Sequence, residues 1–322
     1  MLAPDRVNNQ LISRASSPVE RFPEEGGRTL GVNRRAVLAL GAGAALAVAV
    51  PAQAQASTVT GRLRELERQH NARLGVFATD TGTGRTVLHR ADELFPMCST
   101  FKTIAAAAIL RRDRDGSLLR KVITYTQSDV DKSGHAPVTG RPENLANGMT
   151  VAALCEATIT HSDNCAANLL LRELGGPTAI TRFSRSIGDP VTRLDRWEPE
   201  LNSAEPGRVT DTTSPRAIGQ SYARLTLGHA LNPNDSDQLT NWLLANTTGG
   251  NRIRAGLPSA WRWGDKTGTG KYGTTNDAGI AFPPGRAPIV IAVLSTRQDE
   301  PTGGADEPLL AETAELVAAT LG

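Results

Sequence analysis

The hydrophobic pattern of the chain changes twice, from strand-like to helical and back to strand-like. Near the start, the spacing of charged and leucine residues predicts a helix over 60–70. Residues 74–79 and 85–89 then predict two strands, because the Gly-containing segment 80–84 between them is typical of a hairpin turn. The chain therefore enters a sheet early.

From 99 to 244 the apolar residues follow a helical spacing, interrupted by Gly, Pro and Asn, most clearly over 151–159, 166–173 and 215–225. Strands are then predicted over 261–263, 278–282 and 289–295, with a last helix over 308–321. The chain leaves a sheet, builds a helical region and returns.

This pattern predicts an α/β (α+β) fold, in which an antiparallel sheet is flanked by N- and C-terminal helices and an all-α domain is inserted. The expected division is an α/β domain over 57–91 and 245–322 and an all-α domain over 92–244. A cleft between two such domains is a favoured place for a small-molecule site.

The first 56 residues have the character of an export signal. Asn33-Arg34-Arg35 precedes an apolar run over 36–50, and Pro51 and small residues follow it. The run is shorter than the ~20 residues that a membrane-spanning helix needs. A buried core helix is the alternative interpretation. We expect a twin-arginine-like signal peptide, an exported (secreted or periplasmic) product, and no membrane anchor after cleavage.

Composition narrows the function classes. Formal net charge is +2, and beyond residue 56 the chain carries 29 basic and 29 acidic residues, so nucleic acid is not an expected partner. The five histidines are scattered without a metal-ligand spacing, and three cysteines allow at most one bridge. We expect no metal and no cofactor.

The first candidate chemistry is the pair Ser99 and Lys102, which precedes the apolar stretch 103–110. If that stretch is a helix, the two side chains share one face. A lysine desolvated against an apolar wall loses its charge readily and can then take a proton from a serine hydroxyl. The alternative is a helix N-cap serine followed by a solvated lysine.

Three other segments fit the same chemistry. Ser162-Asp163-Asn164 supplies a second hydroxyl. Glu198 with Asn202 pairs a carboxylate with an amide four residues later, and such a pair could hold a water. The run 265–270, Asp-Lys-Thr-Gly-Thr-Gly, offers a cation, two hydroxyls and backbone N–H groups.

Together these motifs resemble the class A serine β-lactamases, in particular actinobacterial ones, whose S-x-x-K, S-D-N and K-T-G elements occur here in the same order. Steps of 63, 36 and 68 residues separate Ser99, Ser162, Glu198 and Lys266. The resemblance extends from about Leu74 to the C-terminus.

The resemblance implies hydrolysis of the β-lactam amide bond through a serine acyl-enzyme. Ser99 would be the nucleophile, Lys102 and Glu198 the candidate bases for acylation, and Ser162 a proton relay to the lactam nitrogen. Glu198 and Asn202 would hold the deacylating water, and the backbone N–H groups of Ser99 and Thr269 would hold the oxyanion.

Substrate binding is implied for a second set of residues. Asn164 would bind the substrate's side-chain amide, and the K-T-G strand would bind its carboxylate. Relatives often carry an arginine where this chain has Thr275, so Arg252 is expected to supply that charge beside Lys266 and Thr267; a solvated surface arginine is the alternative. The implied binding residues are Asn164, Asn202, Lys266, Thr267, Gly268, Thr269, Arg252 and His135, the last at the cleft mouth or merely exposed.

The resemblance also implies an ion pair between Arg196 and Asp211 and a cis bond between Glu198 and Pro199. It implies no disulfide, because the positions that pair with Cys155 and Cys98 in relatives hold Ala106 and Gly270 here.

Two related functions compete with hydrolysis. A cell-wall DD-peptidase shares most of the motifs but lacks the Glu-x-x-x-Asn loop, and a β-lactam-binding sensor stays acylated and normally needs a membrane segment. Glu198 and Asn202 favour an exported monomeric enzyme with small-molecule β-lactam substrates.

Overall fold

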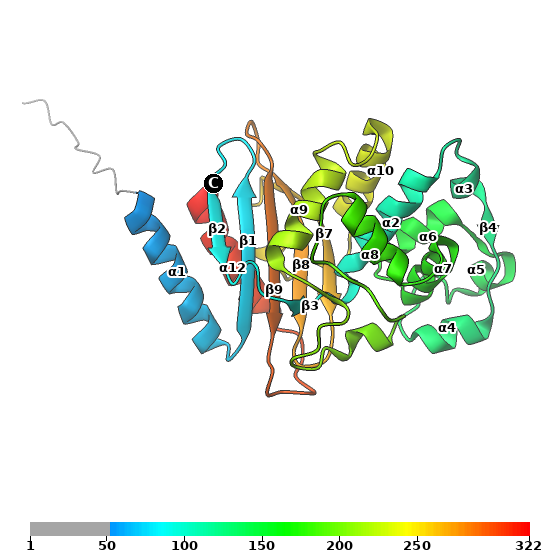
Figure 1. Cartoon of the computed structure of the whole chain (residues 1–322), viewed down its shortest axis with the longest axis horizontal. Helices are drawn as coiled ribbons and strands as arrows, with labels where there is room; N and C mark the ends of the chain where they lie inside the picture. Colours follow the sequence, from blue (N-terminus) through cyan, green and yellow to red (C-terminus); the bar gives the residue numbers. More distant parts are fainter. Residues whose placement is uncertain (1–51) are drawn as a thin grey trace, which may run out of the picture. The chain divides into compact units, whose positions relative to one another are not determined.

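The computed structural model describes residues 52–322, with side chains from Thr58 onward. Most of the predicted signal segment, residues 1–51, lies outside the described residues. Helix α1 (Ala52–Gln69) begins inside the last part of that segment and continues to the end of the helix predicted over 60–70 (Figure 1). Within the described part, no helix is long and apolar enough to cross a membrane.

An antiparallel five-stranded sheet forms the centre, in the order β2-β1-β9-β8-β7. Its strands are β1 (Arg73–Asp80), β2 (Thr86–His89), β7 (Arg262–Thr269), β8 (Thr275–Phe282) and β9 (Ile289–Thr296). The predicted sheet is confirmed. The two edge strands are β2, from the N-terminal part of the described chain, and β7, from its C-terminal part.

Two strand predictions were too short. The segment 278–282 misses the first three residues of β8. The segment 261–263 covers only the first two residues of β7, which begins at Arg262 and continues through Thr269. The continuation of β7 was missed because it contains polar residues next to glycine, which are typical of a turn. In the structure these residues, Asp265, Lys266 and Thr267, are all buried on the strand.

Both faces of the sheet are covered, which explains why β9 is apolar almost throughout. Its residues 289, 291 and 293 pack into one hydrophobic cluster and 290, 292 and 294 into another, as alternation along a strand requires. Helices α1 and α12 (Glu307–Leu321) cover one face, and α9 (Pro215–Thr226) covers the other (Figure 1). A Cβ at Gly219 of α9 would lie 2.6 Å from the Phe77 ring, so glycine permits this close packing.

The helical region surrounds α2 (Phe101–Arg112), whose residues 101–110 are all buried. A helix that is apolar on all sides belongs in a core. The other helices of this region are α3 (Ser117–Arg120), α4 (Gln127–Ser133), α5 (Pro142–Asn147), α6 (Val151–Thr160), α7 (Asn164–Leu174), α8 (Thr178–Ser186) and α10 (Pro233–Leu244). The short helix α11 (Ile253–Gly256) instead packs against α12 on the other face of the sheet.

Short elements complete the region: the 3₁₀ helices η1 (Cys98–Thr100) and η2 (Glu200–Ser203), and the paired strands β3 (Phe95–Pro96) with β6 (Thr212–Thr213) and β4 (Val122–Ile123) with β5 (Met149–Thr150). The helices predicted over 151–159, 166–173 and 215–225 correspond to α6, α7 and α9. The predicted division into an α/β domain and an all-α domain over 92–244 stays a prediction. Helix α9 lies within that segment and packs on the sheet.

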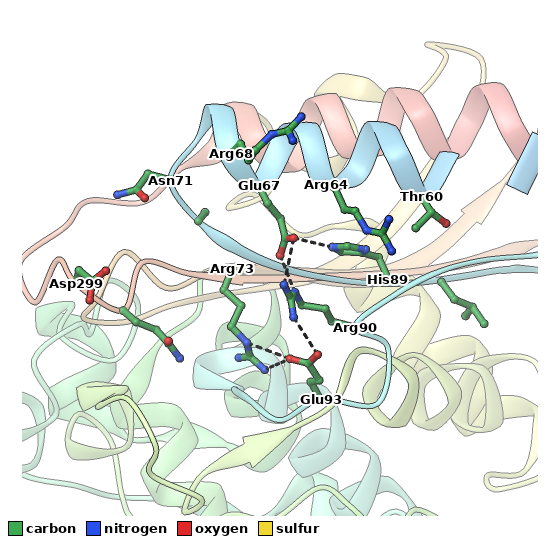
Figure 2. A pocket seen from close by; sticks show the side chains of 13 residues that line it. Thr60, Arg64, Glu67, Arg68, Asn71, Arg73, His89, Arg90, Glu93 and Asp299 are labelled. Atoms are coloured by element: carbon green, nitrogen blue, oxygen red, sulfur yellow. Dashed lines mark hydrogen bonds and ion pairs between the residues drawn. The ribbon is translucent and has the colours of Figure 1, made fainter. Parts of the chain in front are cut away.

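A cavity of about 900 Å³ lies between α1 and the β1–β2 hairpin (Figure 2). Its centre is occupied by the Glu67 carboxylate, which accepts from Arg90 Nε at 2.8 Å and from the Leu74 N–H at 2.9 Å. His89 Nε2 lies 3.0 Å from the same carboxylate. These contacts tie the N-terminal helix to the hairpin, and none of the candidate catalytic residues lines this cavity.

Candidate active site

Ser99 lies at the start of the central helix. It belongs to η1, which leads directly into α2, and the preceding Cys98 has a positive φ of 45°. Such a backbone conformation is unfavourable for a side chain other than glycine and is frequent at functional sites. Two contacts hold the turn: Thr100 Oγ1 donates to Met97 O at 2.7 Å and Tyr222 Oη donates to Thr100 O at 2.7 Å. The Ser99 hydroxyl donates to Glu198 Oε1 at 3.3 Å.

Lys102 is completely buried and points at three polar partners. Its Nζ lies 2.6 Å from Asn164 Oδ1, 2.8 Å from Ser162 O and 3.1 Å from Glu198 Oε1. Burial lowers the pKa of the Lys102 ammonium group, and the Glu198 carboxylate opposes that shift. The predicted helix brings Ser99 and Lys102 together as expected, but both side chains reach toward Glu198.

The Ser162-Asp163-Asn164 segment enters α7 and faces Lys102. Ser162 has a positive φ of 56°, and its Oγ lies 3.3 Å from Lys102 Nζ and 3.1 Å from Lys266 Nζ. Asp163 is the N-cap of α7. Its carboxylate also accepts hydrogen bonds from the backbone N–H groups of Val138 and Thr139 and from the Thr139 hydroxyl. Ser162 is thus held between two lysines, and Asp163 braces the turn.

Glu198 is held in place by its own loop and by α7. The Glu198-Pro199 bond is cis, as predicted, and Asn202 Nδ2 donates to Glu198 Oε2 at 2.5 Å. The Asn168 side chain donates to Glu198 O at 2.9 Å and accepts from Glu198 N at 3.0 Å. Asn168 was not singled out from the sequence, although it lies one helical turn after Asn164. Only 2% of Glu198 is exposed.

Below this loop the predicted ion pair is present. Arg196 Nε lies 2.6 Å from Asp211 Oδ2, and Asp211 Oδ1 accepts the backbone N–H groups of Asp195 and Arg196. A cavity of about 580 Å³ lies against the same loop, and Asn168 and Glu198 are among the residues that line it.

The K-T-G residues form the end of β7 and lie against η1. Lys266 is buried, and its Nζ donates to Thr267 O at 2.8 Å. Burial, with the nearby positive charge of Lys102, lowers the pKa of Lys266 well below its ordinary value. A Cβ at Gly268 would lie 2.9 Å from Met97 O, so glycine lets the strand approach the Ser99 turn. Thr269 is exposed at the strand end.

Arg252 is buried beside this strand end, not solvated. Its Nη1 donates to Gly268 O at 2.9 Å and to Asn276 O at 2.8 Å, and its Nη2 donates to Thr269 Oγ1 at 2.7 Å. Its Nε lies 3.2 Å from Glu307 Oε1. The guanidinium was expected beside Lys266 and Thr267. It instead contacts the next two residues of the strand, Gly268 and Thr269.

The remaining predicted residues are peripheral or buried. His135 is exposed, and its Nε2 lies 3.1 Å from His161 O. Cys98, Cys155 and Cys165 are all buried free thiols, and burial raises the pKa of Cys165 to about 11. Among the described residues, no group of three or more His, Cys, Asp and Glu side chains is arranged to hold a metal ion.

Behind β7 lies a buried polar network that the sequence did not reveal. Asp265 accepts from Asn246 Nδ2 at 2.5 Å and lies 3.2 Å from Arg254 Nη2. Asp277 on β8 lies beside Asp265, and its Oδ2 accepts from the Ile253 N–H at 3.2 Å. Burial and the neighbouring Asp265 carboxylate raise the pKa of Asp277 well above its ordinary value.

The Ser99 hydroxyl and Lys102 Nζ both contact the Glu198 carboxylate, and Lys266 Nζ contacts the adjacent Ser162 hydroxyl. Together with the fold, this arrangement is that of a serine hydrolase. Residues 58–321 match the model of the Beta-lactamase enzyme family. A β-lactamase from Streptomyces fradiae is 64% identical over 294 residues, which cover 89% of this chain and 96% of that protein. The structure of the β-lactamase from Streptomyces albus G has a TM-score of 0.81 and 65% identity, and covers 82% of this chain and 100% of its own. An ancestral class A β-lactamase has a TM-score of 0.76 and 52% identity, with 81% of this chain and 99% of that chain covered. The chain belongs to the class A β-lactamases.

Proposed function

We propose that Ser99 attacks the β-lactam carbonyl and that Glu198 receives its proton. The observation that carries this proposal is the convergence of the Ser99 hydroxyl, at 3.3 Å, and Lys102 Nζ, at 3.1 Å, on a single oxygen, Glu198 Oε1. A base within hydrogen-bond reach is the first requirement for activating a hydroxyl. Lys102 stabilises the carboxylate, and its depressed pKa lets it exchange a proton with its neighbours.

The oxyanion that forms in this step is held by the backbone N–H groups of Ser99 and Thr269. Ser99 lies at a helix start, where N–H groups point outward. When the amide bond breaks, Ser162 donates its proton to the lactam nitrogen and is reprotonated by Lys102, which in turn recovers the proton that Glu198 took from Ser99, so that Glu198 is ionised again. The Ser162 hydroxyl also contacts Lys266. The product of acylation is an ester of Ser99 with the opened ring.

Deacylation uses the same carboxylate. Glu198 and Asn202, joined at 2.5 Å, hold a water that attacks the ester. Glu198 accepts the proton of that water and returns it to Ser99 Oγ as the ester bond breaks, which regenerates the free enzyme. Asn168 keeps the Glu198 backbone in register through two hydrogen bonds. This step separates hydrolysis from the two alternatives, because a DD-peptidase lacks the Glu-x-x-x-Asn loop and a sensor stays acylated.

Substrate binding rests on the β7 strand and its neighbours. Lys266, Thr267, Gly268 and Thr269 receive the carboxylate of the substrate, with Arg252 adding positive charge at the strand end. Arg252 has one Nη2 proton beyond the donors that its protein partners use. Asn164 binds the side-chain amide of the substrate, and His135 lies at the rim.

A chromogenic cephalosporin tests the proposed function directly. Sustained turnover is the expected result, slow leakage would indicate a DD-peptidase, and a single stoichiometric burst would indicate a sensor. The same assay on the Ser99→Ala and Glu198→Ala variants assigns the two steps.

We also propose that the protein is exported and acts as a monomer. The twin-arginine-like segment before residue 56 supports export, and N-terminal sequencing of the secreted protein tests it. Light scattering of the purified protein tests the monomeric state.

A further inference from the structure

A chain of side-chain hydrogen bonds runs from Thr267 to the buried network behind β7. Thr267 Oγ1 lies 2.5 Å from Thr248 Oγ1, which lies 2.9 Å from Asn246 Oδ1. The other end of the Asn246 amide, Nδ2, donates to Asp265 Oδ2 at 2.5 Å. Thr248 therefore links a residue of the proposed substrate site to a buried carboxylate through one amide.

The orientation of the Asn246 amide is fixed from both ends. The Asp265 carboxylate accepts hydrogen bonds, so it selects the NH₂ group of the amide. On the other side, the Thr248 backbone N–H donates to Asn246 Oδ1 at 3.1 Å, which independently selects the oxygen. A Cβ at Gly249 would lie 2.3 Å from Asp265 Oδ2, so glycine leaves room for the carboxylate to reach the amide.

Counting protons then gives two states for the pair of hydroxyls. Each hydroxyl has one proton to donate. When Thr248 donates to Asn246, the proton between the two threonines belongs to Thr267, which cannot then donate to a ligand. When Thr248 donates to Thr267, the Thr267 proton is free. In both states Asn246 Oδ1 keeps the Thr248 N–H, so the switch leaves no buried acceptor unpaired.

The surroundings of Thr267 favour the second state when an anion is present. Lys266 Nζ lies 2.8 Å from Thr267 O and 3.5 Å from Thr267 Oγ1. An anion attracted to this lysine accepts a hydrogen bond from any hydroxyl that can donate one, and a charged acceptor makes a stronger hydrogen bond than a neutral one. A hydroxyl that both accepts and donates is also polarised along the chain.

We propose that Thr248 is a positioning residue for recognition of the substrate carboxylate: its hydroxyl turns from Asn246 to Thr267 and thereby releases the Thr267 proton for the carboxylate. This inference rests on the proposed function, in which Thr267 binds that carboxylate. Thr248 itself does not touch the substrate, and its effect is confined to substrates that carry the negative charge.

The test compares three variants on two substrates. Thr248→Val removes the relay, Thr248→Ser keeps it, and Thr247→Val makes the same change at the neighbouring exposed residue, whose hydroxyl instead donates to Thr160 O. The substrates are a penicillin and the methyl ester of its carboxylate. Thr248→Val should raise KM for the free acid by about three- to tenfold, the effect of losing one hydrogen bond, with kcat within about twofold. Thr248→Ser should restore KM, and Thr247→Val should not change it.

Two comparisons separate a relay from a structural role. Turnover of the methyl ester should be the same for Thr248→Val and the unsubstituted enzyme, and the Thr248→Val effect should vanish in a Thr267→Ala background, since both act on one hydroxyl. An unchanged KM for the free acid, or equal losses for acid and ester, would overturn the inference. Turnover that survives Ser99→Ala would overturn the proposed function instead, so the two failures are distinct.

Discussion

Lys102 Nζ lies 3.1 Å from Glu198 Oε1, although the two residues come from a buried helix and a surface loop. The contact supports the proposal that Glu198 receives the Ser99 proton. A lysine next to a serine in sequence suggests direct proton transfer between them, whereas here the lysine and the serine meet at the carboxylate. The buried pair is also costly to break, because either partner alone would be an unpaired charge in the core.

Replacing Ser99 with alanine should abolish hydrolysis. Its hydroxyl is the one that contacts Glu198 Oε1 from a helix start, and Cys98 next to it is a buried thiol whose pKa burial raises. A slowly released penicillin, followed by digestion and mass spectrometry, should give an adduct on the peptide with Ser99. Mapping of the adduct to Cys98 would contradict the assignment.

Replacing Glu198 should trap the acyl-enzyme. Glu198→Ala removes the base for the attacking water, and Lys102 remains near Ser162 and Asn164 to support slow acylation. Intact-protein mass spectrometry should show a persistent mass increase with penicillin, and multiple-turnover rates should fall at least about a hundredfold, the lower range for loss of a general base. Release of the adduct at the unsubstituted rate would place the base elsewhere. Glu200→Ala, a change of the same type on the same loop, is the control.

Arg252 should contribute to both binding and stability. A charge-assisted hydrogen bond is worth roughly 1.5 to 3 kcal/mol, so Arg252→Ala should lower kcat/KM on penicillins by about ten- to hundredfold. The change also strands the carbonyls of Gly268 and Asn276, so the melting temperature should fall. Arg252→Lys keeps the charge and separates the two effects. Full activity of Arg252→Ala would show that Lys266 works without an arginine.

The sequence predicted the strands and helices that bury apolar side chains. It did not predict the segments in which the buried side chains are polar. Strand β9 and helix α2 were evident because β9 is apolar at every position from Ile289 to Leu294 and α2 from Ile104 to Leu110. The end of β7 was not, because Asp265 and Lys266 are buried only through partners far away in the chain.

The same limit applies within the site. Motif spacing identified Ser99, Ser162, Glu198 and Lys266, but Asn168 acts on a residue 30 positions away and Thr248 on one 19 positions away. Neither has a local signal, since Asn in a helix and Thr in a loop are both ordinary. Their roles follow from tertiary contacts alone.

The buried pair Asp265 and Asp277 should make stability depend on pH. Folding raises the pKa of Asp277, so the folded protein keeps a proton that the unfolded chain releases above about pH 4. The free energy of unfolding should therefore fall as pH rises from about 4 toward the folded pKa, by about 1.4 kcal/mol for each pH unit between the two values. The cationic groups nearby, Lys266, Arg252 and Arg254, reduce this loss without removing it.

Asp277→Asn removes this pH dependence and keeps the geometry. The asparagine amide donates to Asp265, and its oxygen still accepts the Ile253 N–H. Relative to the unsubstituted protein, the variant should gain stability between pH 5 and pH 8 and show little difference near pH 4, as measured by urea unfolding at each pH. Asp299→Asn, the same change on an exposed loop, is the matched control. A stability difference that does not grow with pH would show that Asp277 is ionised in the folded protein.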